Sequence, residues 1–110
     1  MKSKLLTTIG LLLLTPKLLL ADAGWTDAAS VIELTPGSHG RYLVKLDLSN
    51  NHSGCKDKQI FYQDYTDSVA PLIYNTLLQA ITHNKKVRMY VTGKCELSGY
   101  SEINAASILP

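Results

Sequence analysis

The two cysteines, Cys55 and Cys95, are the side chains of this 110-residue chain with the most reactive chemistry. A catalytic thiol requires a histidine partner, and His39, His52 and His83 lie in predicted loops or at a helix end, so a cysteine–histidine pair is conceivable. A metal site requires three or four ligands, and no C-x-x-C or H-x-x-x-H spacing occurs. In an exported chain, two cysteines are explained most simply by one disulfide, so we predict a Cys55–Cys95 bond and no metal site.

Arg88 is the second residue of chemical interest. It lies in the alternating stretch VRMYVT, on the face opposite Val87 and Met89. Its planar guanidinium could bind a carboxylate, such as that of an acidic sugar, or form a salt bridge with an acid on a neighbouring strand. Six tyrosines and one tryptophan add flat apolar rings with polar tips, which suit sugar rings but equally suit cores and subunit contacts.

No sequence motif indicates an enzyme. The carboxylates are scattered without a paired arrangement, and the chain has no nucleophile elbow, no zinc-protease motif and no phosphate-binding loop. We therefore expect a non-enzymatic protein with no catalytic residue and no cofactor.

The N-terminus predicts export. Lys2 and Lys4 precede an apolar run from 5 to 14, and Ala21-Asp22-Ala23 provides a small-x-small cleavage site. We therefore predict that residues 1–23 are a secretory signal, cleaved after Ala23, and that the protein is secreted or periplasmic. A retained membrane anchor is the alternative, but Pro16-Lys17 interrupts an apolar run already shorter than the ~20 residues that span a bilayer.

Cleavage would change the charge balance of the protein. Residues 1–23 contain three lysines and one aspartate, so Lys plus Arg falls from 11 to 8 and Asp plus Glu from 9 to 8. The remaining residues, 24–110, are formally neutral and form one small domain. A nucleic-acid partner is not expected, because such binding depends on a basic surface that displaces counterions.

The hydrophobic pattern predicts five strands and one helix. In Gly40–Leu48 the residues Tyr42, Val44, Leu46 and Leu48 share one face, the clearest strand signal in the chain. The order β-β-β-α-β-β, with the helix between the third and fourth strands, is typical of a small, mainly β OB-fold barrel. The predicted elements are strands at 29–34, 40–48, 59–65, 87–92 and 103–109 and a helix at 69–83.

The predicted helix has an apolar stripe wider than a surface helix requires. The apolar residues extend from one face of the helix round its side. Ser68 is the predicted N-cap, which puts Pro71 in the first turn, where a missing N–H costs nothing. The expected stripe consists of Leu72, Ile73, Leu77, Ala80 and Ile81, extended by Tyr74 and Leu78.

Several short stretches resemble the B subunits of AB5-type bacterial toxins, including those of subtilase cytotoxin, typhoid toxin and the pertussis type. They are GWTD at 24–27, a serine heading the first strand, RYLV at 41–44, SGC at 53–55 and LLQAITHNKKVRMYV at 77–91. The resemblance implies an OB-fold that assembles as a ring of five, binds cell-surface glycans and carries an enzymatic A subunit.

Two glycan-binding positions of that family fall on matching residues. The serine at the head of the first strand is Ser30, and the arginine that follows the helix is Arg88. A further family lysine has no counterpart, since Leu48 and Ser49 occupy its region. The cysteines also differ, because the family partner of Cys55 lies in the second strand, which here reads YLVKL.

The sequence thus leads to a main hypothesis and an alternative. The first is a secreted, lectin-like B-subunit-type protein that acts as a homo-oligomer without membrane insertion. Its expected partners are a cell-surface glycan and, if the protein is part of a toxin, an A subunit. The alternative is a stand-alone periplasmic OB-fold module with a protein or envelope partner.

Overall fold

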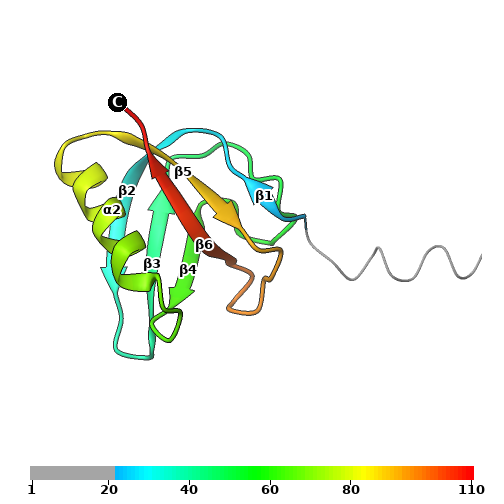
Figure 1. The fold of residues 1–110 in the computed structure, drawn as a ribbon. Coiled ribbons are helices and arrows are strands. Elements are labelled where there is room, and N and C mark those ends of the chain that lie inside the picture. The colour runs from blue at the N-terminus through cyan, green and yellow to red at the C-terminus, as the bar shows by residue number, and fades with distance from the viewer. Residues whose placement is uncertain (1–21) are drawn as a thin grey trace, which may run out of the picture.

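In the described part of the chain, five strands form a closed barrel and helix α2 (Ala70–Thr82) lies on its side (Figure 1). The computed structural model describes residues 22–110, so the predicted signal lies outside the described residues except for its last two positions. The elements are β1 (Gly24–Trp25), β2 (Ala29–Pro36), β3 (Arg41–Leu46), β4 (Ile60–Asp64), α2 (Ala70–Thr82), β5 (Lys86–Val91) and β6 (Ser101–Ile108).

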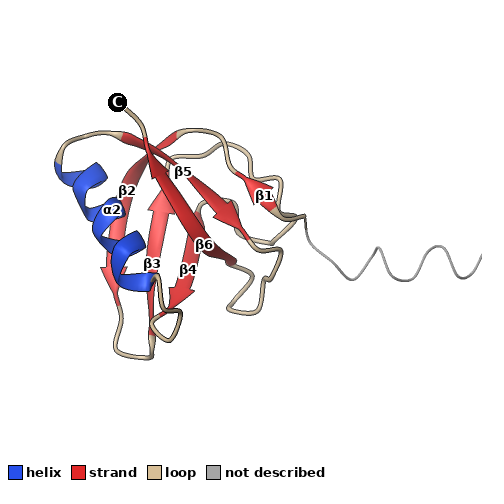
Figure 2. Cartoon of the chain, in the orientation of Figure 1, coloured by secondary structure: helices blue, strands red, loops and turns tan. Residues whose placement is uncertain are grey.

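Five strands close the barrel in the order β5-β2-β3-β4-β6, and β6 pairs again with β5. All these neighbours are antiparallel except β4 and β6, which run parallel. The helix falls between the third and fourth of the five barrel strands, as predicted, and the architecture is that of a small OB-fold-like domain (Figure 2).

The barrel interior is filled by alternate residues of the strands. Tyr42, Val44 and Leu46 of β3 are buried, and Leu48 beyond the strand end is buried too, so the predicted face is confirmed. Phe61, Met89 and Ile103 come from three other strands and are each 0% exposed. This alternation leaves the odd-numbered residues of β3 and the even-numbered residues of β5 on the outer surface.

Helix α2 packs on the barrel through one narrow stripe. Ala70, Ile73, Leu77 and Ala80 are buried, at the spacing of one helical face. Leu72, predicted to belong to this stripe, is instead 70% exposed, because it lies about 100° round the helix from Ile73. The predicted stripe was therefore too wide at Leu72 and Leu78, which are exposed, whereas Tyr74 and Ile81 pack against the core.

The start of α2 also differs from the prediction. Ser68 is not the N-cap: the cap is Val69, and its side chain makes no capping hydrogen bond. Asp67 stabilises this end instead, because its Oδ1 accepts from the backbone N–H of Val69 at 3.2 Å and its carbonyl accepts from that of Ala70 at 3.0 Å. Pro71 lies in the first turn, as predicted.

Candidate functional site

Strand β5 presents Arg88 on the outer surface of the barrel. Val87, Met89 and Val91 are each 0% exposed in the core, whereas Arg88 is exposed. The salt-bridge alternative for Arg88 is not observed: among residues 22–110 the one side-chain ion pair joins Arg41 and Asp64. Arg88 is therefore an exposed cation without a carboxylate partner in the described part of the chain.

Ser30 falls on the same face as Arg88. It is the cross-strand partner of Lys86 in the antiparallel pairing of β2 with β5, and paired residues share a face of the sheet. Arg88 lies two residues further along β5, which makes it the diagonal neighbour of Ser30, at about 7–8 Å. The register thus places the two predicted sugar-binding residues on one surface.

Trp25 is the member of this surface that sequence reasoning did not identify as a site residue. Strand β1 pairs with the end of β5, where Trp25 lies opposite Tyr90. The indole is 46% exposed and contacts the Tyr90 ring edge-on, with centroids 5.5 Å apart. The Arg88 guanidinium carbon lies 6.0 Å from the Trp25 ring centroid, within cation–π range. We call Trp25, Ser30, Arg88 and Tyr90 the outer-face cluster.

Thr26 fixes the position of Trp25. Its backbone N–H donates to the Met89 carbonyl at 2.8 Å, and its hydroxyl oxygen accepts from the Met89 N–H at 3.1 Å. Thr26 is itself buried, so this double hydrogen bond is shielded from water. A two-residue strand has no periodicity to recognise, and β1 was not among the predicted strands.

The outer-face cluster is suited chemically to a sugar acid. A guanidinium that lies over an aromatic ring keeps its in-plane N–H groups available, and these match the two oxygens of a carboxylate. The exposed part of the indole offers an apolar surface to the C–H face of a sugar ring, and the Ser30 hydroxyl adds a small donor and acceptor. Lys86 contributes a second positive charge to the same face.

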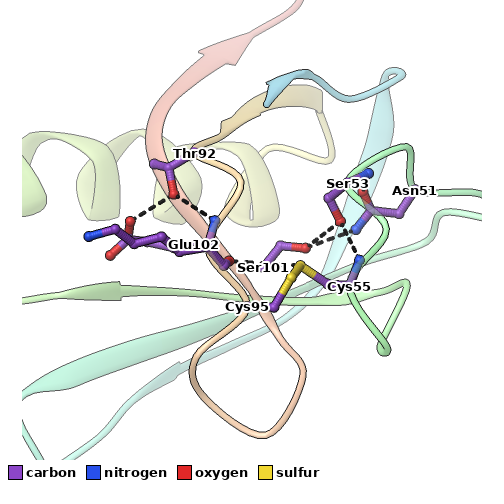
Figure 3. Close-up of a disulfide and its surroundings, with 8 residues drawn as sticks. Asn51, Ser53, Cys55, Thr92, Cys95, Ser101 and Glu102 are labelled. Atoms are coloured by element: carbon purple, nitrogen blue, oxygen red, sulfur yellow. Dashed lines mark hydrogen bonds between the residues drawn. A yellow bond between two sulfur atoms is a disulfide. The ribbon is translucent and has the colours of Figure 1, made fainter. Parts of the chain in front are cut away.

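The cysteines form the predicted disulfide, within one chain (Figure 3). Cys55 and Cys95 are joined with their Cα atoms 5.5 Å apart, and no cysteine among residues 22–110 is free. A thiol nucleophile is therefore not present in the described part of the chain. In that same part, no group of three histidine, cysteine or acidic side chains gathers as a metal site would require.

A buried polar network lies next to the disulfide. The Ser101 hydroxyl is 2.9 Å from that of Ser53 and 3.2 Å from the Asn51 side-chain nitrogen, and all three residues are buried. The Cys55 N–H donates to the Ser53 hydroxyl at 3.2 Å, as Figure 3 shows. These bonds join the 51–55 loop to β6, which indicates a structural role for the cysteine region.

Comparison with protein-family models, with curated proteins and with solved structures finds no match in any of the three. Within residues 22–110, no helix is both long and apolar enough to cross a membrane. The likeness to toxin B subunits therefore rests on the short sequence stretches alone, and the function must be argued from the surface of the barrel.

Proposed function

We propose that this protein is an exported, non-enzymatic lectin-like domain that binds acidic cell-surface sugars through the outer-face cluster. The observation that carries the proposal is the Arg88 guanidinium, which lies over a half-exposed tryptophan and has no acidic partner among the described residues. Exposing a tryptophan forgoes the stability that its burial would contribute, so an exposed indole aligned with an unpaired cation favours a binding role.

The wider form of the proposal is a B-subunit role. In it, several copies assemble into a ring that presents many sugar sites and delivers an enzymatic A subunit. Contact between copies is supported by exposed apolar side chains at α2, namely Val69, Leu72 and Leu78. Repetition of the site would also raise the avidity of individually weak sugar contacts. The disulfide is compatible with the oxidising compartment that export implies.

A glycan array, followed by titration, tests sugar binding. We expect the exported, oxidised protein to bind sialylated or uronic-acid glycans and to change the fluorescence of Trp25, the single tryptophan of the chain. Arg88→Ala should weaken binding about 10- to 100-fold, the loss expected for one charge-assisted contact, while circular dichroism is unchanged. Lys58→Ala, which removes an exposed charge before β4, is the matched control and should bind normally.

The outcomes separate the proposal from its rivals. Full binding by Arg88→Ala, or an array without any acidic ligand, would contradict the assignment of the outer-face cluster. Arg88→Lys refines the test, because lysine keeps the charge and loses the planar fork. Partial recovery with lysine would identify charge as the main contribution, whereas no recovery would identify bidentate geometry.

Self-assembly has its own measurement. Native mass spectrometry of the exported protein should show one closed oligomer, and Leu72→Glu should dissociate it, because a charge at the 70%-exposed Leu72 position would enter the contact. A monomer at micromolar concentration would refute the ring while leaving the sugar site to be tested separately.

A further inference from the structure

A hollow of about 290 Å³ lies on the barrel surface, and none of its lining residues belongs to the outer-face cluster. One wall comes from β2, β3 and the hairpin between them, and the other from the loop that joins β5 to β6. Its volume is at the small end of the range for small-molecule sites, enough for a single ring. The lining residues are Thr35, Gly37, His39, Arg41, Leu43, Leu97 and Tyr100.

The loop that forms the second wall is held at several points. Cys95 ties it to Cys55, the Asp57 N–H donates to the Gly99 carbonyl at 3.0 Å, and the Tyr100 N–H donates to the Leu97 carbonyl at 2.7 Å. Gly99 has a φ of +80°, and a Cβ there would approach the Lys56 Cβ to 2.7 Å. Leu97 and Tyr100 are thus presented by a braced loop, so the wall is pre-formed.

The polar chemistry of the hollow centres on Arg41, a lining residue that forms an ion pair with Asp64. Arg41 and Asp64 face each other across β3 and β4, and the Arg41 Nε donates to Asp64 Oδ1 at 3.1 Å. The guanidinium carbon also lies 5.8 Å from the Tyr62 ring centroid. Within residues 22–110, the two terminal nitrogens of Arg41 have no hydrogen-bond partner. Arg41 therefore brings free donors to the hollow, and the carboxylate of Asp64, which is not itself a lining residue, lies beside Arg41 on the neighbouring strand.

Such a pair suits hydroxyl groups better than an anion. Neighbouring hydroxyls of a sugar each donate and accept, so they match a guanidinium next to a carboxylate. The surroundings are also rich in carboxylates: burial raises the pKa of Tyr62, and the negative charges of Glu102, Glu96 and Asp64 raise it further. Here Arg41 is neutralised by Asp64, whereas Arg88 on the outer face has no acid beside it.

We infer that this hollow is a second sugar site, one that takes a single neutral sugar ring. The hydroxyls bond to the Arg41–Asp64 pair, and the C–H face of the ring packs against Leu43, Leu97 and Tyr100. The inference deepens the proposed function, on which it rests for the class of ligand. It assigns the two surfaces to two different parts of a glycan, an acidic terminal sugar and a neutral one.

Amide-resolved NMR titration of the exported, oxidised protein tests the site. The probes are the methyl glycosides of glucose, galactose and N-acetylglucosamine, with sialic acid as the acidic comparator. At least one neutral probe should shift the backbone signals of Leu97, Tyr100 and the β2–β3 hairpin while the indole signal of Trp25 stays in place. Sialic acid should shift the Trp25 signal instead.

Two variants make the test specific. Asp64→Asn keeps the shape of the half-exposed side chain and removes its charge, and it should weaken neutral-sugar binding about tenfold. Gly99→Ala displaces the braced loop without touching the disulfide and should have a similar effect. Arg88→Ala should leave neutral-sugar binding unchanged, and the spectrum of each variant reports whether it is folded.

The failures of the two proposals are distinguishable. If sialic acid binds and no neutral probe shifts the hollow at tens of millimolar, the hollow site is overturned and the outer-face site stands. If a neutral probe binds with the same affinity in Asp64→Asn, the role of the ion pair is overturned. If neither class of sugar binds anywhere, both proposals fail together.

Discussion

Replacing both cysteines by alanine should lower the free energy of unfolding by about 4 kcal/mol. The bond between Cys55 and Cys95 spans a sequence separation of 40 residues. In the chain-entropy model, closing a loop of that length removes about 13 cal/mol/K from the unfolded state, which is about 4 kcal/mol at 25 °C. Small domains have total stabilities of about 5–15 kcal/mol, so the loss is a large part of the whole.

Hydrogen bonds of the loop between β5 and β6 limit how far the folded state changes when the disulfide is removed. The N–H groups of Asp57 and Glu102 bond to the carbonyls of Gly99 and Lys94, each at 3.0 Å, and neither bond depends on sulfur. Cys55 is only 3% exposed, so alanine is a better replacement than serine, whose hydroxyl would need a buried partner. The loss should therefore come mainly from the larger entropy of the unfolded chain.

Urea unfolding measures this loss. Trp25 fluorescence and circular dichroism would follow the unfolding of three proteins: the oxidised wild type, the double alanine variant and the Cys95→Ala single variant. The wild type should unfold at a higher urea concentration, and its thermal midpoint should exceed that of the double variant by about 15–30 °C, at about 4–8 °C per kcal/mol. A difference below about 1 kcal/mol would refute the reasoning, provided that mass spectrometry confirms the disulfide in the wild type.

Three further predictions concern the core. Leu77→Ala, at a position 0% exposed, should cost about 2–5 kcal/mol in thermal or urea unfolding, and a loss near zero would contradict the packing of α2 on the barrel. Ser101→Ala should cost about 1–3 kcal/mol, because it leaves buried Asn51 and Ser53 groups without their partner; wild-type stability would rule out the network. Burial, followed by the negative charge of Asp67, raises the pKa of Tyr42 above its usual value near 10. The stability that this pKa shift represents is complete below about pH 10 and is lost as the pH rises through the folded-state pKa of Tyr42. The urea midpoint should therefore fall as the pH rises above about 10, and it should fall less steeply in Tyr42→Phe.

The sequence alone predicted most of the barrel because two of its central strands, β3 and β5, follow a strict period of two. The alternation in β3 and β5 identified Tyr42, Val44 and Met89 as core residues and placed Arg88 outside, and burial confirms both faces. The disulfide followed from the number of cysteines in a chain expected to be exported. Alternation is a local property of each strand, and the disulfide prediction follows from the presence of only two cysteines. Neither prediction requires knowledge of which elements pack together.

Tertiary structure decided the features that depend on which elements meet. Leu72 was predicted as a core residue, but the barrel does not cover its side of α2. Ser68 was predicted as the N-cap, but the cap is Val69, and Asp67 accepts the hydrogen bonds at this end of the helix. Trp25 joined Arg88 only because two residues of β1 pair with the end of β5. The sequence determined which residues could be buried or charged. The pairing of strands that are distant along the chain decided which of these residues form a surface together, because local periodicity does not encode that pairing.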